Sequence, residues 1–136
     1  MQNHFDLSDP IFEQQFANCQ LDPTLFSHEA HLRLAWIHID KYGIRKAVEN
    51  IGSQLKKFVV HVRATDKYHQ TITITAIQAV NHFMKQSKSD NFKDFIIEFP
   101  QLKNDFKSLI NSHYTMDVFN SEVARKEYIK PDLIPF

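Results

Sequence analysis

The sequence predicts an all-α protein, a single domain over residues 1–136 in which about four main helices and several short ones form a bundle. Only two glycines, Gly43 and Gly52, are present, far fewer than the tight turns of an all-β chain of this length would need. Hydrophobic residues recur at spacings of three and four along most of the chain, which is typical of amphipathic helices. A chain of 136 residues is expected to bury a substantial core.

The first two helices have clear start and stop signals. Asp9 is the predicted cap of a short helix that has Pro10 as its first residue. A longer helix is predicted over residues 28–42, because Ser27 is a favourable N-cap and Gly43 stands where a helix commonly ends.

The spacing of apolar residues predicts a third helix over residues 44–62, paired with the second as a helical hairpin. The next segment contains TITITAI, which alternates like a strand, but the spacing of three and four in the following residues favours a helix over 67–85, capped by Asp66. A polar loop is expected at 87–91. Shorter helices are predicted at residues 92–99, 102–110 and 121–128.

Composition bears on partners and location. Sixteen Lys and Arg balance sixteen Asp and Glu, and without a clustered basic patch we expect neither nucleic acid nor an anionic membrane as a partner. The single Cys19 cannot form an internal disulfide, and the N-terminal residues lack the pattern of a signal peptide. The longest apolar run is too short to span a bilayer. The expected location is therefore the cytoplasm.

Eight histidines are the most distinctive feature of the composition. Three of them share the helix predicted over 28–42, where His31 follows His28 by three residues and His38 follows His31 by seven. These spacings place the three rings on one helical stripe, and the small Ala35 on that stripe leaves room for a ligand.

Two interpretations of the histidines stay open. In the first, His31 and His69, with His28 or His113, converge between helices and bind a divalent metal such as zinc or iron, or else act without metal as an acid and a base. In the second, the histidines are partly buried and satisfied by hydrogen bonds to threonines, tyrosine or backbone carbonyls.

Two arginines and the tryptophan complete the candidate set. The guanidinium of Arg33 or Arg125, placed near the histidines, would bind a carboxylate or a phosphate, although either can equally be a surface or helix-end charge. Trp36 and the twelve phenylalanines suggest a ligand pocket, whereas core packing explains most of these aromatic residues.

Three segments carry a resemblance to a family: FSHEAHLRLAW at 26–36, KYHQTIT at 67–73, and SEVAR at 121–125 followed by PDL. They resemble small uncharacterised bacterial helical proteins with the motifs F-x-H-x-x-H-L-R-x-A-W, Y-H-E-T-x-T and S-x-x-A-R. The resemblance runs from about Leu21 to the C-terminus, and it implies no activity. Gln70 stands where the family has an acidic residue. The residues that it groups together are His28, His31, Tyr68, His69, Thr71, Thr73 and Arg125.

Two classes of function follow from a polar pocket expected between the helices predicted over 28–42 and 67–85. The first is a small-molecule-binding protein that can be an enzyme, with His31 and His69 as catalytic residues and with His28 joining them if a metal is bound. The second is a non-catalytic binding or protein-interaction module with a structural His/Thr network, in which apolar segments at 94–99 and 133–136 contact a partner or form a homodimer. The predicted substrate-binding residues are Tyr68, Thr71, Thr73, Arg33, Arg125 and Trp36.

Overall fold

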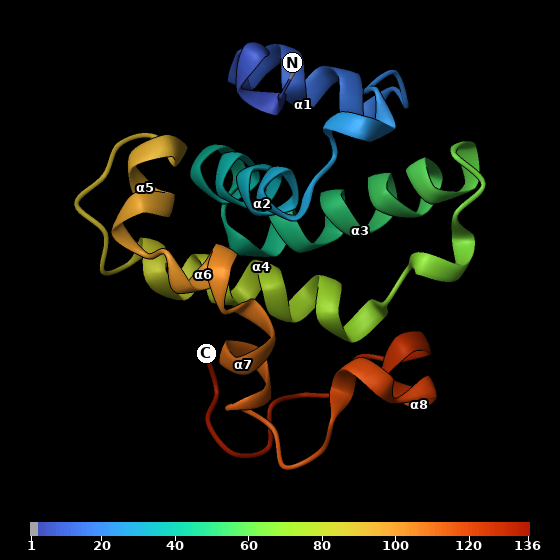
Figure 1. The fold of residues 1–136 in the computed structure, drawn as a ribbon, viewed down its shortest axis with the longest axis vertical. Helices are drawn as coiled ribbons and strands as arrows, with labels where there is room; N and C mark the ends of the chain where they lie inside the picture. The colour runs from blue at the N-terminus through green and yellow to red at the C-terminus, as the bar shows by residue number, and fades with distance from the viewer. Residues whose placement is uncertain (1–2) are drawn as a thin grey trace. The chain divides into compact units, whose positions relative to one another are not determined.

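The computed structural model describes residues 3–136 and shows that they are all-α, with no strand among them (Figure 1). The predicted fold class is therefore confirmed. The chain forms two compact units, Met1–Tyr68 (unit 1) and His69–Phe136 (unit 2), and each is described by itself. The expected single domain stays a prediction.

Unit 1 contains the helical hairpin that the sequence predicts. Helices α2 and α3 pack against each other, and α1 packs against both (Figure 1). The buried residues of α3, Ala47, Ile51, Leu55 and Phe58, recur at spacings of three and four. The elements of unit 1 are η1 (His4–Asp6), α1 (Asp9–Ala17), η2 (Pro23–Leu25), α2 (His28–Tyr42), α3 (Ile44–His61) and η3 (Thr65–Lys67).

The helix ends of unit 1 test the predicted caps. The Oγ of Ser27 accepts a hydrogen bond from the backbone N–H of Ala30 at 3.2 Å, so Ser27 is the N-cap of α2. Gly43 joins α2 to α3 with φ of +87°, a backbone conformation that favours glycine. The prediction for α1 is wrong by one residue, because the helix begins at Asp9 and Ser8 occupies the cap position.

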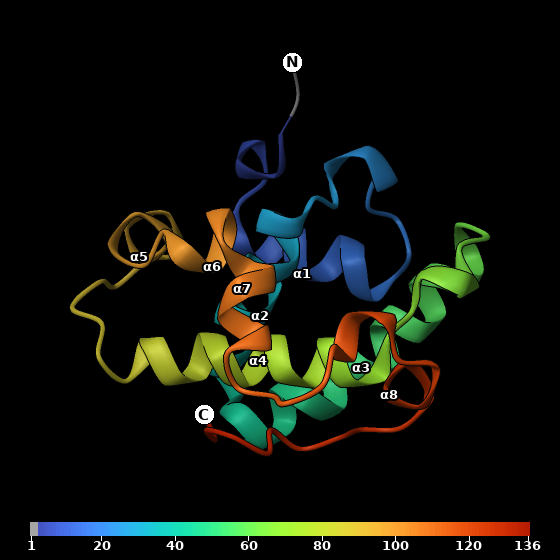
Figure 2. The ribbon, with the colours of Figure 1, turned by 60° about the horizontal axis from the view of Figure 1, so that its bottom comes forward.

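Unit 2 is built around α4, which packs against α8 and η4 (Figure 2). The TITITAI segment is helical, as predicted. Along α4 the buried residues Thr71, Thr75 and Ala79 recur every four positions, which is the helical period. The elements of unit 2 are α4 (Gln70–Met84), α5 (Phe92–Glu98), α6 (Gln101–Asn104), α7 (Phe106–Asn111), η4 (Val118–Asn120) and α8 (Glu122–Lys126).

Two predicted elements of this half need correction. The helix predicted over 67–85 begins later, at Gln70, because the imidazole of His69 and not the carboxylate of Asp66 caps its first turn. The helix predicted over 102–110 is two helices, because the backbone at Asp105 (φ −140°, ψ 35°) leaves the helical region between α6 and α7.

None of the helices within residues 3–136 combines the length and the apolar character that crossing a membrane requires.

Candidate functional site

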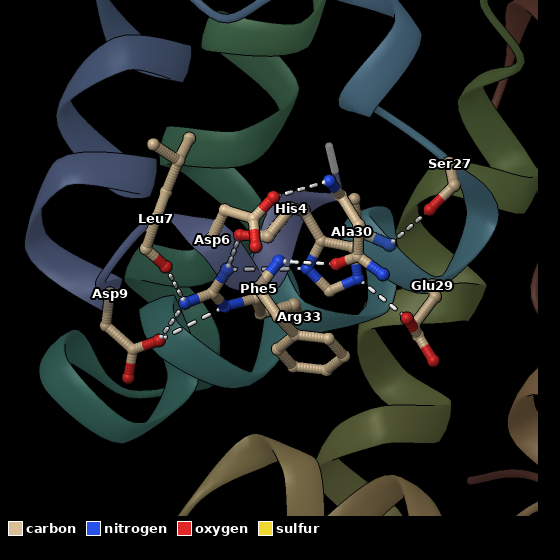
Figure 3. A network of polar contacts seen from close by, with 10 residues as sticks. His4, Phe5, Asp6, Leu7, Asp9, Ser27, Glu29, Ala30 and Arg33 are labelled. Carbon is tan, nitrogen blue, oxygen red and sulfur yellow. Dashed lines mark hydrogen bonds and ion pairs between the residues drawn. The ribbon is translucent and has the colours of Figure 1, made fainter. Parts of the chain in front are cut away.

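The guanidinium of Arg33 on α2 is buried and holds the segment that precedes α1 (Figure 3). Its Nε and Nη2 atoms donate to Oδ1 of Asp9 at 3.1 and 2.8 Å. Its Nη1 and Nη2 atoms also donate to the backbone carbonyls of His4 and Leu7, at 2.6 and 2.8 Å. A guanidinium has five N–H groups, so these four bonds leave one N–H, on Nη1, which faces the imidazole of His4.

The ring of His4 connects Arg33 to Glu29 (Figure 3). Its Nδ1 lies 3.3 Å from Nη1 of Arg33, and its Nε2 lies 2.7 Å from Oε1 of Glu29. Because arginine can only donate, Nδ1 must accept, and the ring hydrogen of neutral His4 is then on Nε2, from which it is donated to Glu29. Every N–H of Arg33 therefore has an acceptor in unit 1.

This network gives Arg33 a different setting from the one expected for a substrate-binding residue. The carboxylate of Asp9 stands where the carboxylate of an anionic ligand would bind Arg33. The backbone carbonyls of His4 and Leu7 accept the other hydrogen bonds of the guanidinium. Sequence reasoning missed His4 and Asp9 as partners of Arg33, because they lie 29 and 24 residues away along the chain. No local pattern marks contacts at such separations.

His31 on α2 is exposed, as is His28 at the start of the same helix. It stacks on the ring of Phe26, with 3.9 Å between the centroids, and it forms no hydrogen bond within residues 3–136. Neighbouring protein atoms that displace water, and then the charge of nearby His28, lower the pKa of His31 to about 4. At pH 7 the imidazole is neutral.

His38 and Trp36 are part of the buried layer of α2. The His38 side chain is fully buried, and neither ring nitrogen forms a hydrogen bond within residues 3–136. Burial lowers the pKa of His38, although the carboxylate of Glu13 opposes the shift. Trp36 is also buried, which fits the core-packing alternative.

His69 uses both ring nitrogens within unit 2. Its Nδ1 accepts the backbone N–H of Ile72 at 3.1 Å, and this bond caps α4. Its Nε2 lies 2.9 Å from the carbonyl oxygen of Val118, to which it donates. The ring is therefore the neutral Nε2–H tautomer, because protonation of Nδ1 would remove the cap. Burial lowers the pKa of His69, and the bond to Val118 counteracts part of that shift.

The two predicted threonines also bond to backbone. The hydroxyl of buried Thr71 donates to the carbonyl oxygen of Glu127 at 2.8 Å and accepts the N–H of Ile129 at 3.0 Å. The hydroxyl of Thr73 donates to the carbonyl oxygen of His69 at 2.7 Å, within the first turn of α4. Thr71 thus connects α4 to the segment that follows α8, whereas Thr73 bonds locally.

A tyrosine that the sequence analysis did not select extends this network. The hydroxyl of Tyr114 lies 3.0 Å from that of Thr75 on α4 and donates to the carbonyl oxygen of Ile129 at 2.7 Å. Ile129 is therefore held through its N–H by Thr71 of α4 and through its carbonyl by Tyr114, which lies between α7 and η4.

Tyr68 and Arg125 lie in different units. In unit 1, the Nζ atom of Lys56 is 5.6 Å from the centroid of the Tyr68 ring. In unit 2, Nε of partly exposed Arg125 lies 3.8 Å from a carboxylate oxygen of Glu122, within one turn of α8. The charge of Arg125 also acts on His69 and favours its neutral form.

The predicted metal ligands divide between the units, with His28 and His31 in unit 1 and His69 in unit 2. Within residues 3–136, no group of three or more His, Cys, Asp or Glu side chains is arranged to hold a metal ion. The convergence of these three histidines, and the pocket expected between their helices, stay predictions.

Comparison with models of protein families, with curated proteins and with solved structures finds no match.

Proposed function

We propose that this protein is a non-catalytic interaction module in which the His/Thr network is structural. The observation that supports the proposal is the engagement of both ring nitrogens of His69, one as the cap of α4 and one on Val118. A catalytic histidine needs a nitrogen that can exchange a proton with a substrate, and a metal ligand needs one with a free lone pair. His69 offers neither without breaking a bond of unit 2.

The network positions the C-terminal segment, which carries the interaction surface in this proposal. The backbone carbonyl of His113 accepts a hydrogen bond from the N–H of Leu133 at 3.0 Å. The Nδ1 atom of the His113 ring lies 2.6 Å from the carbonyl oxygen of Ile134. Phe136 stacks on the same ring, with 3.7 Å between centroids. Leu133 and Ile134 nevertheless remain 56% and 55% exposed. Because this apolar segment is already ordered, it loses little conformational entropy when it binds a partner. The proposed partner is a second copy of the chain, which would contact Leu133 and Ile134.

Light scattering coupled to size exclusion tests this proposal. The intact chain is expected to show a mass that rises towards that of a dimer with concentration, and the double variant Leu133→Ser/Ile134→Ser is expected to stay a monomer. The matched control is Val123→Ser, which removes an equally exposed aliphatic side chain from α8 and should leave the mass unchanged. A monomeric intact chain at high micromolar concentration would contradict the proposal.

A second candidate is the small-molecule site around His31, which one observation favours. Its ring is accessible, neutral at pH 7 and without a hydrogen bond within residues 3–136, so a lone pair is available to a ligand or a proton. In this version His28 and Phe26 flank the ring, and any metal is bound through His31.

Elemental analysis of protein purified without an affinity tag distinguishes the two candidates. A stoichiometric divalent metal that is lost in His31→Ala, with helix content unchanged, would support the second candidate. The interaction module instead predicts no stoichiometric metal. It also predicts that His69→Ala lowers the melting temperature more than His31→Ala does, because His69 bonds to both α4 and η4, whereas His31 loses only a ring contact with Phe26.

A further inference from the structure

The end of α3 and the turn that follows it form a strongly basic surface on unit 1. Lys56, Lys57, Arg63 and Lys67, here called the basic end of α3, are all exposed, and His61 is exposed beside them. The only carboxylate in the 56–67 segment is that of Asp66. Lys57, Arg63 and Lys67 form no ion pair within residues 3–136, whereas Arg45 and Lys46 at the other end of the helix lie near Glu49.

The backbone after α3 folds back and brings these charges together. The N–H of Ala64 bonds to the carbonyl of Val59 at 2.7 Å, and Arg63 adopts a positive φ of 59° at the bend. The Nζ atom of Lys56 lies over the ring of Tyr68, which places the end of the turn beside the helix. A helix dipole favours a cation only in the last turn of the helix. It does not account for positive charges on the end of α3, on the turn after it and on η3 together.

The neutrality of the chain conceals this concentration of charge, and the expectation that the chain has no clustered basic patch is wrong. Residues 1–40 contain six acidic side chains and one arginine, whereas residues 41–68 contain seven lysines and arginines and two acidic side chains. A long polyanion on unit 1 meets repulsion from the acidic elements as well as attraction to the basic end. A short anionic ligand meets mainly the local positive charge.

We propose that the basic end of α3 binds a short acidic polypeptide segment of a partner protein. Val60 follows Lys56 and Lys57 by one helical turn and precedes Arg63 by three residues, and it is 64% exposed. A phosphate backbone has no apolar group for this side chain, whereas an acidic peptide with an apolar residue covers Val60 and pairs with the lysines. The inference rests on the proposed function, because it names a partner class for the interaction module.

Fluorescence polarisation with a labelled peptide of six glutamates and two leucines tests the proposal. The intact chain is expected to bind this peptide more weakly as salt increases, and not to bind its glutamine counterpart. Lys57→Glu/Lys67→Glu should weaken binding about tenfold or more. The matched control is Lys126→Glu/Lys130→Glu, which makes the same charge change on exposed lysines of unit 2 and should bind normally.

Three outcomes would overturn the inference: no binding by the intact chain, equal weakening in both double variants, or tighter binding of single-stranded DNA of the same charge. Circular dichroism checks that the variants keep their helix content. Light scattering on Lys57→Glu/Lys67→Glu separates this inference from the proposed function, because self-association through Leu133 and Ile134 should persist in that variant. A failure to bind peptide with self-association intact rejects the acidic partner alone.

Discussion

His38 is the residue whose burial is least compensated. Its side chain is fully buried on α2, and both ring nitrogens lack a hydrogen bond within residues 3–136. A buried polar group without a partner destabilises a fold by about 1–3 kcal/mol, whereas an apolar side chain of similar size avoids that penalty. The remaining charged or polar groups that act on the ring are Glu13, Lys41 and Tyr42.

Replacement of His38 by leucine is therefore expected to stabilise the protein. His38→Leu should raise the free energy of unfolding at pH 7 by about 1 kcal/mol, measured by urea denaturation. His61→Leu is a control, because His61 is exposed on α3 and its replacement should change stability by less than about 0.5 kcal/mol. A destabilised His38→Leu protein would show that the imidazole makes a stabilising contact.

At the scale of single elements, Thr71 of α4 helps to hold the segment that follows α8 in place. Thr71 makes two bonds to this segment, to Glu127 and to Ile129, while Thr73 bonds within its own helix turn. The two hydroxyls are two residues apart on one helix, so they form a natural pair for comparison. Removal of the Thr71 hydroxyl should loosen the segment that follows α8, and removal of the Thr73 hydroxyl should not.

Thr71→Val is expected to lower the free energy of unfolding by about 1–3 kcal/mol, because it leaves the partly buried N–H of Ile129 without its acceptor. Thr73→Val should cost less than about 0.5 kcal/mol. Hydrogen exchange provides the sharper measurement. The exchange rate of the Ile129 amide should rise in Thr71→Val and should stay the same in Thr73→Val. Equal exchange in both variants would show that the hydroxyl of Thr71 does not hold the segment.

The elements also show what the sequence can and cannot predict. Apolar spacing and local caps predicted α2, α3 and their hairpin, since Ser27 and Gly43 act on neighbouring residues. The start of α4 was misplaced because histidine is not among the usual capping residues. The partners of His69 and Thr71 are backbone carbonyls 49 and 56 residues away, and a backbone atom has no identity in the sequence.

For the whole molecule, the histidines determine how stability depends on pH. Burial lowers the pKa of His38 and of His69, and desolvation lowers that of His31 to about 4. The unfolded chain binds protons at these groups from about pH 6.5 downward, while the folded chain does not until a lower pH. Stability should therefore be greatest above about pH 6.5 and fall as the pH decreases towards 4.

Urea denaturation at a series of pH values checks this expectation. The free energy of unfolding should decrease between about pH 7 and pH 5, before most carboxylates titrate. In His38→Leu the decrease should be smaller, because one of the three histidines with a lowered pKa is absent. A constant or rising stability over this range would contradict the neutral, buried state assigned to His38 and His69.

The central claim is that His69 is a structural residue with both ring nitrogens occupied, and the nitrogen resonances of its imidazole test that claim most directly. Long-range ¹H–¹⁵N spectra at pH 7 should show the neutral tautomer with hydrogen on Nε2, as the bonds to Ile72 and Val118 require. Addition of Zn²⁺ should leave these resonances in place. A hydrogen on Nδ1, or resonances of His69 that shift on stoichiometric Zn²⁺, would contradict the structural role.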